Sequence, residues 1–329
     1  MNDDVLSMRF DQYQRYKLVA DVLERVRANG QPLDVLDVGG RTALLRRFLP
    51  DRVVLLDLET SPEPGLVLGS GSKMPFGDKS FDVVAAFDTL EHVPVGERAA
   101  FVRECARVAR RFVILAGPYE HPRVVEAEQV LQRFISDKLG GSVRHLDEHR
   151  HHGLPERSEV EAQLAALGGR VIGLPHGNLE RWLACQCVAF YMDWHPSLQG
   201  LAEDFHRFYN RSLYPNDHAE PVYRYVVVAA FGGAQLPDFG DLLAPPVTPP
   251  GSVALFSELV GELGAFERGR GESASQIEGL TKSLEETQRA YRDLLAEYQR
   301  VLAGLHRLEG VYNSRWASLK RAIGPRRRR

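Results

Sequence analysis

The sequence predicts an α/β fold, a Rossmann-like doubly wound sheet, followed by a C-terminal α-helical coiled coil. Three observations lead to this prediction. Short apolar runs alternate with helical patterns over residues 33–231, as in sheets whose strands are joined by crossover helices. The first run ends in Gly39 and Gly40, a turn typical of nucleotide-binding pockets. From Ile277 onward, apolar residues repeat with heptad spacing.

The individual elements follow from the spacing of apolar residues and from glycine stops. Strands are predicted at residues 33–38, 53–56, 66–68, 81–87, 112–115, 170–174 and 222–231. Helices are predicted at residues 9–28, 95–110, 124–139, 158–167, 178–191 and 201–213. A helical pattern also follows the glycine turn, in which Leu44, Leu45, Phe48 and Leu49 recur. Ser158 and Glu161 have the spacing of a capping box.

Two carboxylates frame the glycine turn and indicate the ligand. Asp57 ends the second predicted strand, where an acid is placed to bind a ribose diol. A dinucleotide needs glycines spaced G-x-G-x-x-G, but Arg41 and Leu44 stand at the later positions. Asp37 would also repel a pyrophosphate, whereas S-adenosylmethionine (SAM) carries positive charge and no phosphate. The residue chemistry therefore favours SAM over a nicotinamide dinucleotide.

Two stretches resemble class I SAM-dependent methyltransferases of the type-11 group. The segment Asp37–Ala43 is similar to the acid-x-Gly-x-Gly-x-Gly loop of that family, with Arg41 and Ala43 at the later glycines. A longer match lies in the stretch GSGSKMPFGDKSFDVVAAFDTLEHVP, at residues 74–76, 80–84 and 88–93. The resemblance implies the seven-stranded methyltransferase sheet over roughly residues 33–231, with SAM as cofactor.

The resemblance also implies which residues hold the cofactor. Asp57 would bind the ribose hydroxyls, and Asp37 with the Gly39–Gly40 backbone would face the methionine portion. Ser70 replaces the family acid that contacts adenine, and its hydroxyl would accept that hydrogen bond without charge assistance. The full expected cofactor-binding set is Asp37, Gly39, Gly40, Asp57, Leu58, Ser70, Gly71, Ser72, Met74, Phe87 and Asp88.

Residues 144–155 gather histidines and acids in a segment that we expect to be a loop. Its polar members are His145, Asp147, Glu148, His149, His151 and His152. Three interpretations stay open: a metal site, a base for an acceptor hydroxyl, or a solvated polar loop. The segment follows the fifth strand, where the family builds its acceptor site. The candidate catalytic residues are therefore His149, Glu148 and His92, and no metal ligand is assigned.

The methyl acceptor is predicted from the C-terminal extension. A coiled coil and a basic tail fused to the domain look like bacterial proteins of surface-glycan assembly. This predicts O-methylation of a sugar hydroxyl, in surface-glycan or other secondary biosynthesis, on a small-molecule or glycan acceptor. A second hypothesis is a degenerate methyltransferase fold that acts as a coiled-coil scaffold, because Arg41, Ala43 and Ser70 depart from the family pattern.

The composition is that of a globular protein: 329 residues, 44% hydrophobic and 26% charged, with a formal charge of −3. Three cysteines provide no disulfide framework, and arginine outnumbers lysine 35 to 6, as in proteins from GC-rich bacterial genomes. Neither a signal peptide nor a membrane-spanning segment is visible. We expect a cytoplasmic protein with peripheral contact at the inner face of the membrane.

The domain boundaries are placed where the composition changes. The first region is a methyltransferase domain at 1–232, with a helical insertion near 175–215. It is followed by a proline-rich linker at 233–252, a helical and coiled-coil region at 253–313, and a basic tail at 314–329. Within the third region, Gly269 and Gly271 are expected to separate a short helix from the heptads. The heptads predict a homo-oligomer. The tail, with Trp316 among arginines, predicts contact with an anionic membrane and no sequence-specific nucleic-acid binding.

Overall fold

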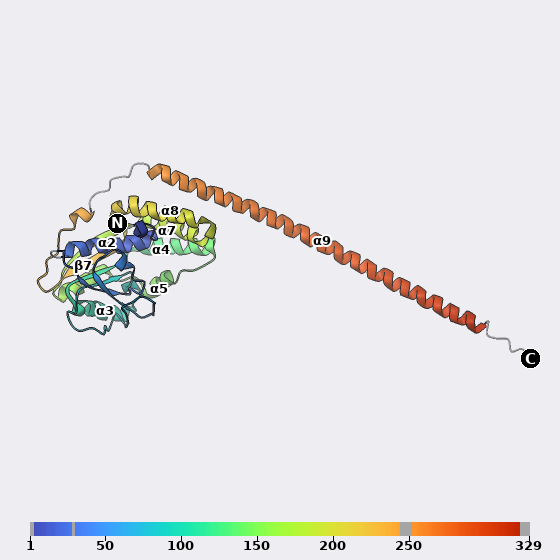
Figure 1. The fold of residues 1–329 in the computed structure, drawn as a ribbon, viewed down its shortest axis with the longest axis horizontal. Coiled ribbons are helices and arrows are strands. Elements are labelled where there is room, and N and C mark those ends of the chain that lie inside the picture. The colour runs from blue at the N-terminus through green and yellow to red at the C-terminus, as the bar shows by residue number, and fades with distance from the viewer. Residues whose placement is uncertain (1–2, 28–29, 244–251, 323–329) are drawn as a thin grey trace, which may run out of the picture. The chain divides into compact units, whose positions relative to one another are not determined.

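The computed structural model describes residues 3–27, 30–243 and 252–322, and the chain divides into two compact units, residues 1–253 and 254–329. The first unit contains one seven-stranded sheet of order β3-β2-β1-β4-β5-β7-β6. Helices lie on both sides of this sheet (Figure 1). The strands are β1 (Asp34–Val38), β2 (Arg52–Asp57), β3 (Leu66–Leu68), β4 (Phe81–Phe87), β5 (Ala109–Pro118), β6 (Arg170–Asn178) and β7 (Val222–Ala230). β7 runs antiparallel to β5 and β6, and the other neighbours are parallel. The predicted Rossmann-like sheet is confirmed.

Helices and short turns connect these strands. The α-helices of the first unit are α1 (Asp3–Leu6), α2 (Phe10–Val26), α3 (Val95–Val108), α4 (Pro122–Phe134), α5 (Arg144–His152), α6 (Arg157–Ala166), α7 (Leu179–Trp194) and α8 (Gln199–Phe208). The 3₁₀ and π turns are η2 (Leu44–Arg47), η3 (Leu90–His92), η4 (Ile135–Leu139), η5 (Pro196–Leu198), η6 (Tyr209–Leu213), η7 (Tyr214–Asn216) and η8 (Gly240–Leu243). In chain order, α7 and α8 lie between β6 and β7, and α7 packs against α4.

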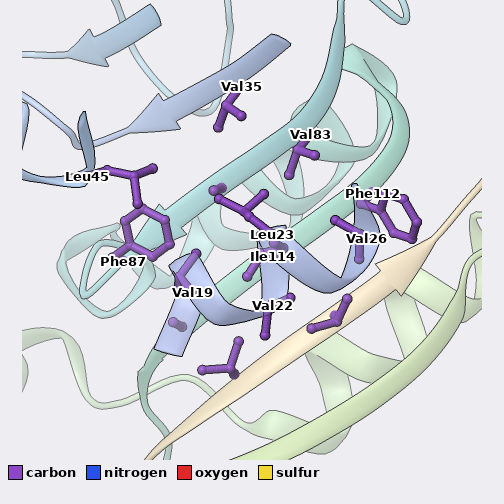
Figure 2. Close-up of a cluster of buried hydrophobic side chains, with 14 of the residues drawn as sticks. Val19, Val22, Leu23, Val26, Val35, Leu45, Val83, Phe87, Phe112 and Ile114 are labelled. Atoms are coloured by element: carbon purple, nitrogen blue, oxygen red, sulfur yellow. The ribbon is translucent and has the colours of Figure 1, made fainter. Parts of the chain in front are cut away.

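The sheet is buried on both faces, because successive side chains of a strand point to opposite sides. Val35 of β1 belongs to an apolar cluster that α2 covers with Val19, Val22 and Leu23 (Figure 2). The next residue, Leu36, belongs to the opposite cluster, which includes apolar residues of α3 and α6. Burial on both faces explains why the central strands read as continuous apolar runs and not as alternating patterns.

The carboxyl ends of β1, β2 and β4 meet at one edge of the sheet. Val38 of β1 is in register with Leu56 of β2 and with Ala86 of β4. The strand order reverses between β1 and β4, and ligands of open α/β sheets bind in the crevice at such a point. Gly39 and Asp57, which follow or end these strands, are therefore brought to that crevice.

The helix predicted after the glycine turn is wrong. Residues 39–51, all of which the structure describes, contain only the single 3₁₀ turn η2. Ala43 precedes it in a left-handed conformation, with φ of 53°, and Pro50 follows the last apolar residue. Leu45 is fully buried in the cluster under α2. The helix-like spacing of apolar residues therefore arises because a short connection between strands is buried, and not because a helix forms.

Two further local predictions are corrected. Residues 144–152, expected as a loop, form the helix α5, in which Leu146 and His149 are buried and three residues apart. Gly153, with φ of 68°, follows its last residue. The expected capping box at Ser158 is also wrong, because α6 begins at Arg157 and its N-cap makes no side-chain hydrogen bond.

The second unit contains one continuous helix, α9 (Ser252–Ala322), so Gly269 and Gly271 do not interrupt it. Interior glycine costs about 1 kcal/mol relative to alanine, a penalty that a long helix tolerates. The heptad residues are exposed on this helix, Ile277 by 64% and Leu294 by 65%, and their pairing stays a prediction. Residues 244–251 of the predicted linker and 323–329 of the basic tail lie outside the described residues. None of the described helices has both the length and the apolarity needed to cross a membrane.

Candidate active site

A cavity of about 480 Å³ lies at the carboxyl edge of β1, β2 and β4. The expected cofactor residues that line it are Gly39, Asp57, Leu58, Ser70, Gly71, Ser72 and Asp88. It is also lined by Arg144, His145 and Glu148 of α5, and by His92 of η3. One cavity therefore joins the expected cofactor residues to part of the expected acceptor segment.

Four residues of the expected cofactor set are not among the lining residues. Asp37 is buried behind Gly40, where a Cβ atom would come within 2.3 Å of the Asp37 carboxyl carbon. Met74 and Phe87 are side chains of the two apolar clusters. Asp37, Met74 and Phe87 are thus buried side chains, and the structure gives them no exposure to the cavity.

The carboxyl group of Asp37 is poorly compensated. Burial raises its pKa to about 7, although the cation of Arg46 acts in the opposite direction. Its Oδ2 atom is buried and has no hydrogen-bond partner. The group is thus partly protonated near neutral pH, and a nearby positive charge would favour its ionised form.

Close packing explains two of the glycines that line the cavity. Gly39 has φ of 84°, and a Cβ there would lie 2.5 Å from Oγ1 of Thr89. A Cβ on Gly71 would lie 2.3 Å from the ring of Phe101. Both sites exclude a larger residue, so these glycines let the backbone approach the cavity.

Asp57 and Ser70 present acceptor oxygens to the cavity. The Asp57 carboxylate accepts hydrogen bonds from the backbone N–H of Glu59, at 2.9 Å, and of Arg41, at 3.4 Å. The Ser70 hydroxyl accepts from the backbone N–H of Ser72 at 3.1 Å. Each oxygen still has a free lone pair, as a ribose diol or an adenine amino group would require.

Asp88 has partners that the sequence did not reveal. Arg15 of α2 lies 2.8 Å from its carboxylate, and Arg224 of β7 contacts both oxygens. Burial opposes ionisation, but the two guanidinium groups outweigh it and hold the pKa of Asp88 well below its usual range. The one sequence signal was an arginine inside the apolar run of β7, where a buried charge needs a partner.

Histidines and carboxylates pack together where α5 meets η3, beside the cavity. His92 Nδ1 lies 2.8 Å from Glu148 Oε2, and both residues line the cavity. The ring of His149 lies behind His92, with 4.9 Å between centroids, and is not among the lining residues. Its Nδ1 is 2.8 Å from Glu128 Oε1, and its Nε2 is 3.9 Å from Glu91 Oε1.

The pKa values of these histidines and carboxylates are shifted by burial and by neighbouring charges. Burial, with the nearby His149, lowers the pKa of His92, so its imidazole is neutral at neutral pH. Burial and the Asp88 charge raise the pKa of Glu91 to about 8. Burial opposes ionisation of Glu148, but the Arg144 hydrogen bond outweighs it and lowers the pKa. Sequence reasoning quoted Glu91 within the motif and assigned it no role.

A chain of ion pairs runs among the residues that line the cavity, from Arg41 to His92. Arg41 contacts Glu59 at 2.6 Å, and Arg144 contacts Glu59 at 3.3 Å. Arg144 also contacts Glu148 at 2.6 Å, and Glu148 contacts His92. The loop after β2 is thereby tied to α5 across the residues that line the cavity.

A family model and several solved structures are similar to this chain. Residues 36–116 match a family model described as a methyltransferase domain. No curated protein matches the chain. Similar solved structures include magnesium protoporphyrin IX methyltransferase from Synechocystis with bound SAH, the demethylated product of SAM. It has 13% identity and a TM-score of 0.39, over 68% of this chain and 84% of that chain.

Two further structures are similar at low identity. A possible histamine N-methyltransferase from Thermotoga maritima has 12% identity and a TM-score of 0.40, over 69% of this chain and 98% of that chain. A SAM-dependent methyltransferase from Archaeoglobus fulgidus has 14% identity and a TM-score of 0.40, over 66% and 94%. The family match therefore identifies a methyltransferase domain at residues 36–116, within the seven-stranded sheet of the first unit.

Proposed function

We propose that the first unit transfers the methyl group of SAM to a hydroxyl group of a polar acceptor, a sugar in bacterial surface-glycan or other secondary biosynthesis. One observation carries the proposal: Asp57 and the His92–Glu148 pair line the same cavity. The acceptor end is lined by charged and imidazole groups, including Arg144 and His145, which suit a hydroxylated ligand.

The chemical step is an in-line displacement, so the protein mainly positions the two reactants. The acceptor O–H gives its proton to the His92–Glu148 pair, and the acceptor oxygen forms a bond to the methyl carbon. The bond from that carbon to sulfur breaks, and its electron pair stays on sulfur, which yields SAH. The neutral imidazole and ionised carboxylate of the pair are both able to accept a proton.

The three expected catalytic residues take different parts in this proposal. We assign proton transfer to His92 and Glu148, because both line the cavity. His149 contacts the ring of His92 from behind and is held by Glu128, so we assign it a positioning part. Of the expected cofactor residues, we assign the ribose to Asp57 and the adenine to the segment Ser70–Ser72.

Calorimetric titration of SAM and SAH into the full-length protein tests the cofactor half of the proposal. Release of SAH in the presence of a panel of monosaccharides and lipid-linked glycans tests the acceptor half. We expect binding of both nucleosides and SAH release with hydroxyl acceptors. If SAM binds but SAH is released only with an amine acceptor and with none of the sugars, the reaction is N-methylation and the proposed O-methylation is wrong.

A second candidate function is a degenerate fold that serves as a scaffold. The observation in its favour is that Arg41, at a family glycine position, lines the cavity and pairs with Glu59 beside Asp57. This ion pair competes for the space near the ribose site. Failure of SAM and SAH to bind at millimolar concentration would support the scaffold, and binding of either would exclude it.

We further propose that the heptads of α9 pair between copies of the chain and that the basic tail contacts anionic lipid. The exposed apolar stripe of α9 supports pairing, because a single helix would leave it in water. Trp316 and Leu319, exposed among basic residues, support lipid contact. Flotation with anionic and neutral liposomes, with and without residues 315–329, tests the second part; equal flotation after deletion would contradict it.

A further inference from the structure

Three side chains form a cluster at the wall of the cavity: Glu91 and His92 on η3, and His149 on α5. The helix α5 packs against η3, so residues more than fifty positions apart meet here. One nitrogen or oxygen atom from each of the three side chains lies within 4.8 Å of the others. Glu91 is 1% exposed and His149 is 4% exposed, so most of the cluster is inside the protein.

Three buried atoms of this cluster have no hydrogen-bond partner: Glu91 Oε1, His149 Nε2 and His92 Nδ1, the last of which lies 2.8 Å from Glu148 Oε2 in an ion-pair contact. Glu91 Oε1 and His149 Nε2 face each other at 3.9 Å. An unpaired buried polar atom costs about 1–3 kcal/mol, and more when the group is charged. Gly117 of β5 leaves room for the carboxylate, because a Cβ there would lie 3.0 Å from Glu91 Oε2. A ligand that both atoms can bind would remove this cost.

The opposite nitrogen of His149 is held so that Nε2 is directed at Glu91. Glu128 Oε1 lies 2.8 Å from His149 Nδ1 and also accepts the hydroxyl of Tyr223 at 2.7 Å. Because the Glu128 carboxylate binds Nδ1, Nε2 is the nitrogen left for a metal ion, which would take the place of any proton there. Histidine ligands of metal ions are oriented by carboxylates in this way.

We propose that Glu91, His92 and His149 bind a divalent transition-metal ion. Two imidazoles and a carboxylate suit Zn²⁺, Mn²⁺, Co²⁺ or Fe²⁺ better than Mg²⁺ or Ca²⁺, which prefer oxygen ligands. An ion about 2.1 Å from each ligand atom would separate those atoms by about 3–4 Å, so a shift of about 1 Å closes the site. Glu148, beside His92, supplies a second carboxylate that balances the charge of the ion.

The position of His92 gives the ion a part in the reaction. Because His92 lines the cavity, an open coordination position of the ion would face the acceptor. A hydroxyl oxygen bound there is easier to deprotonate. With the ion bound, His92 acts as a ligand and Glu148 alone takes the proton. This part rests on the proposed function, whereas binding of the ion does not.

The test uses the full-length protein without cofactor, stripped with EDTA and titrated with Zn²⁺, Mn²⁺, Co²⁺ and Mg²⁺ separately. We expect one transition-metal ion per chain, with Co²⁺ giving the visible absorption of a site with nitrogen ligands. Glu91→Gln and His92→Gln should each weaken binding at least tenfold. Glu128→Gln should weaken it by about 10–100-fold, because it releases the orientation of His149. His151→Gln, an exposed histidine of the same helix, is the matched control and should bind as the parent protein does.

The result that overturns the site is no uptake by the parent protein, or equal affinity in the parent, Glu91→Gln and His92→Gln. His92 is 28% exposed, so its variant remains informative if Glu91→Gln does not fold. Melting curves taken without metal check that each variant folds. If the ion binds but methyl transfer is the same with and without it, the catalytic part is overturned and the site stands. Failure of SAM to bind would instead overturn the proposed function.

Discussion

Arg224 of β7 contacts both carboxylate oxygens of Asp88, the residue that follows β4. Its Nε lies 2.9 and 3.1 Å from the two oxygens, and its Nη2 lies 2.6 Å from one of them. Asp88 has φ of 41°, a left-handed conformation that costs energy in a residue with a side chain. The ion pair therefore joins the antiparallel strand to the end of β4, next to the cavity.

Asp88→Asn should lower the free energy of unfolding by about 3–5 kcal/mol, because it leaves a buried guanidinium without its charge partner. Arg224 is 2% exposed, so water cannot replace the carboxylate. Urea denaturation measures the change. Asp78→Asn is the matched control: Asp78 is 76% exposed in its contact with Arg107, and its loss should cost under about 1 kcal/mol. Equal effects at the two sites would contradict the structural part assigned to Asp88.

Asp37→Asn should change the pH dependence of stability. The folded pKa of about 7 lies above the unfolded value of 3.8, so between these pH values the folded state binds more protons than the unfolded state. Stability from this group is therefore present at low pH and is lost as pH rises from about 4 to about 7. The free energy of unfolding of the variant, relative to that of the parent, should rise by about 2–3 kcal/mol from pH 5 to pH 8. Denaturation at the two pH values measures it, and a gap that does not change with pH would show that Asp37 ionises normally.

Asp57→Ala should weaken SAH binding at least tenfold. A charge-assisted hydrogen bond to a ribose hydroxyl contributes about 1.5–3 kcal/mol, and tenfold corresponds to about 1.4 kcal/mol. Isothermal titration measures the affinity. Glu24→Ala, at an exposed position of α2, controls for the loss of one negative charge. Unchanged affinity in Asp57→Ala would remove this residue from the ribose site.

Glu148→Gln should lower the rate of methyl transfer by about 10²–10⁴, the range for loss of a general base, and leave SAH affinity unchanged. Among the contacts of the described residues, this carboxylate binds His92 and Arg144 and neither Asp57 nor Ser70, so we expect only the acceptor side to be affected. Glu97→Gln is the control, because Glu97 also lines the cavity without a described contact to His92. Full activity in Glu148→Gln, or loss of SAH binding, would contradict the assignment.

Paired substitutions in the heptads of α9 should separate the oligomer. Leu294→Glu with Leu308→Glu puts like charges on the expected seam, so the mass by light scattering should fall to that of one 36.9 kDa chain. Gln299→Glu with His306→Glu adds the same charge away from the seam and should leave the oligomer intact. A parent protein that is already monomeric would rule out pairing through α9.

The sequence by itself determined the strands, the glycine turn and the heptads of α9. These features are encoded by neighbouring residues: a run buried on both faces must be apolar throughout, and a close backbone approach at Gly39 requires the absence of a Cβ. The match at residues 74–93 likewise came from a continuous stretch. Local patterns failed where few residues face inward, as in α5, where Leu146 and His149 are the buried pair.

Only the tertiary structure decided which polar groups meet. Asp88 and Arg224 are 136 residues apart, and the partners of His149 come from α4 and η3. Periodicity along the chain shows which side of an element is buried, but it contains no information about which buried polar group faces which. That choice depends on how the helices and strands pack, because a buried charge is stable only where packing brings an opposite charge or a ligand to it.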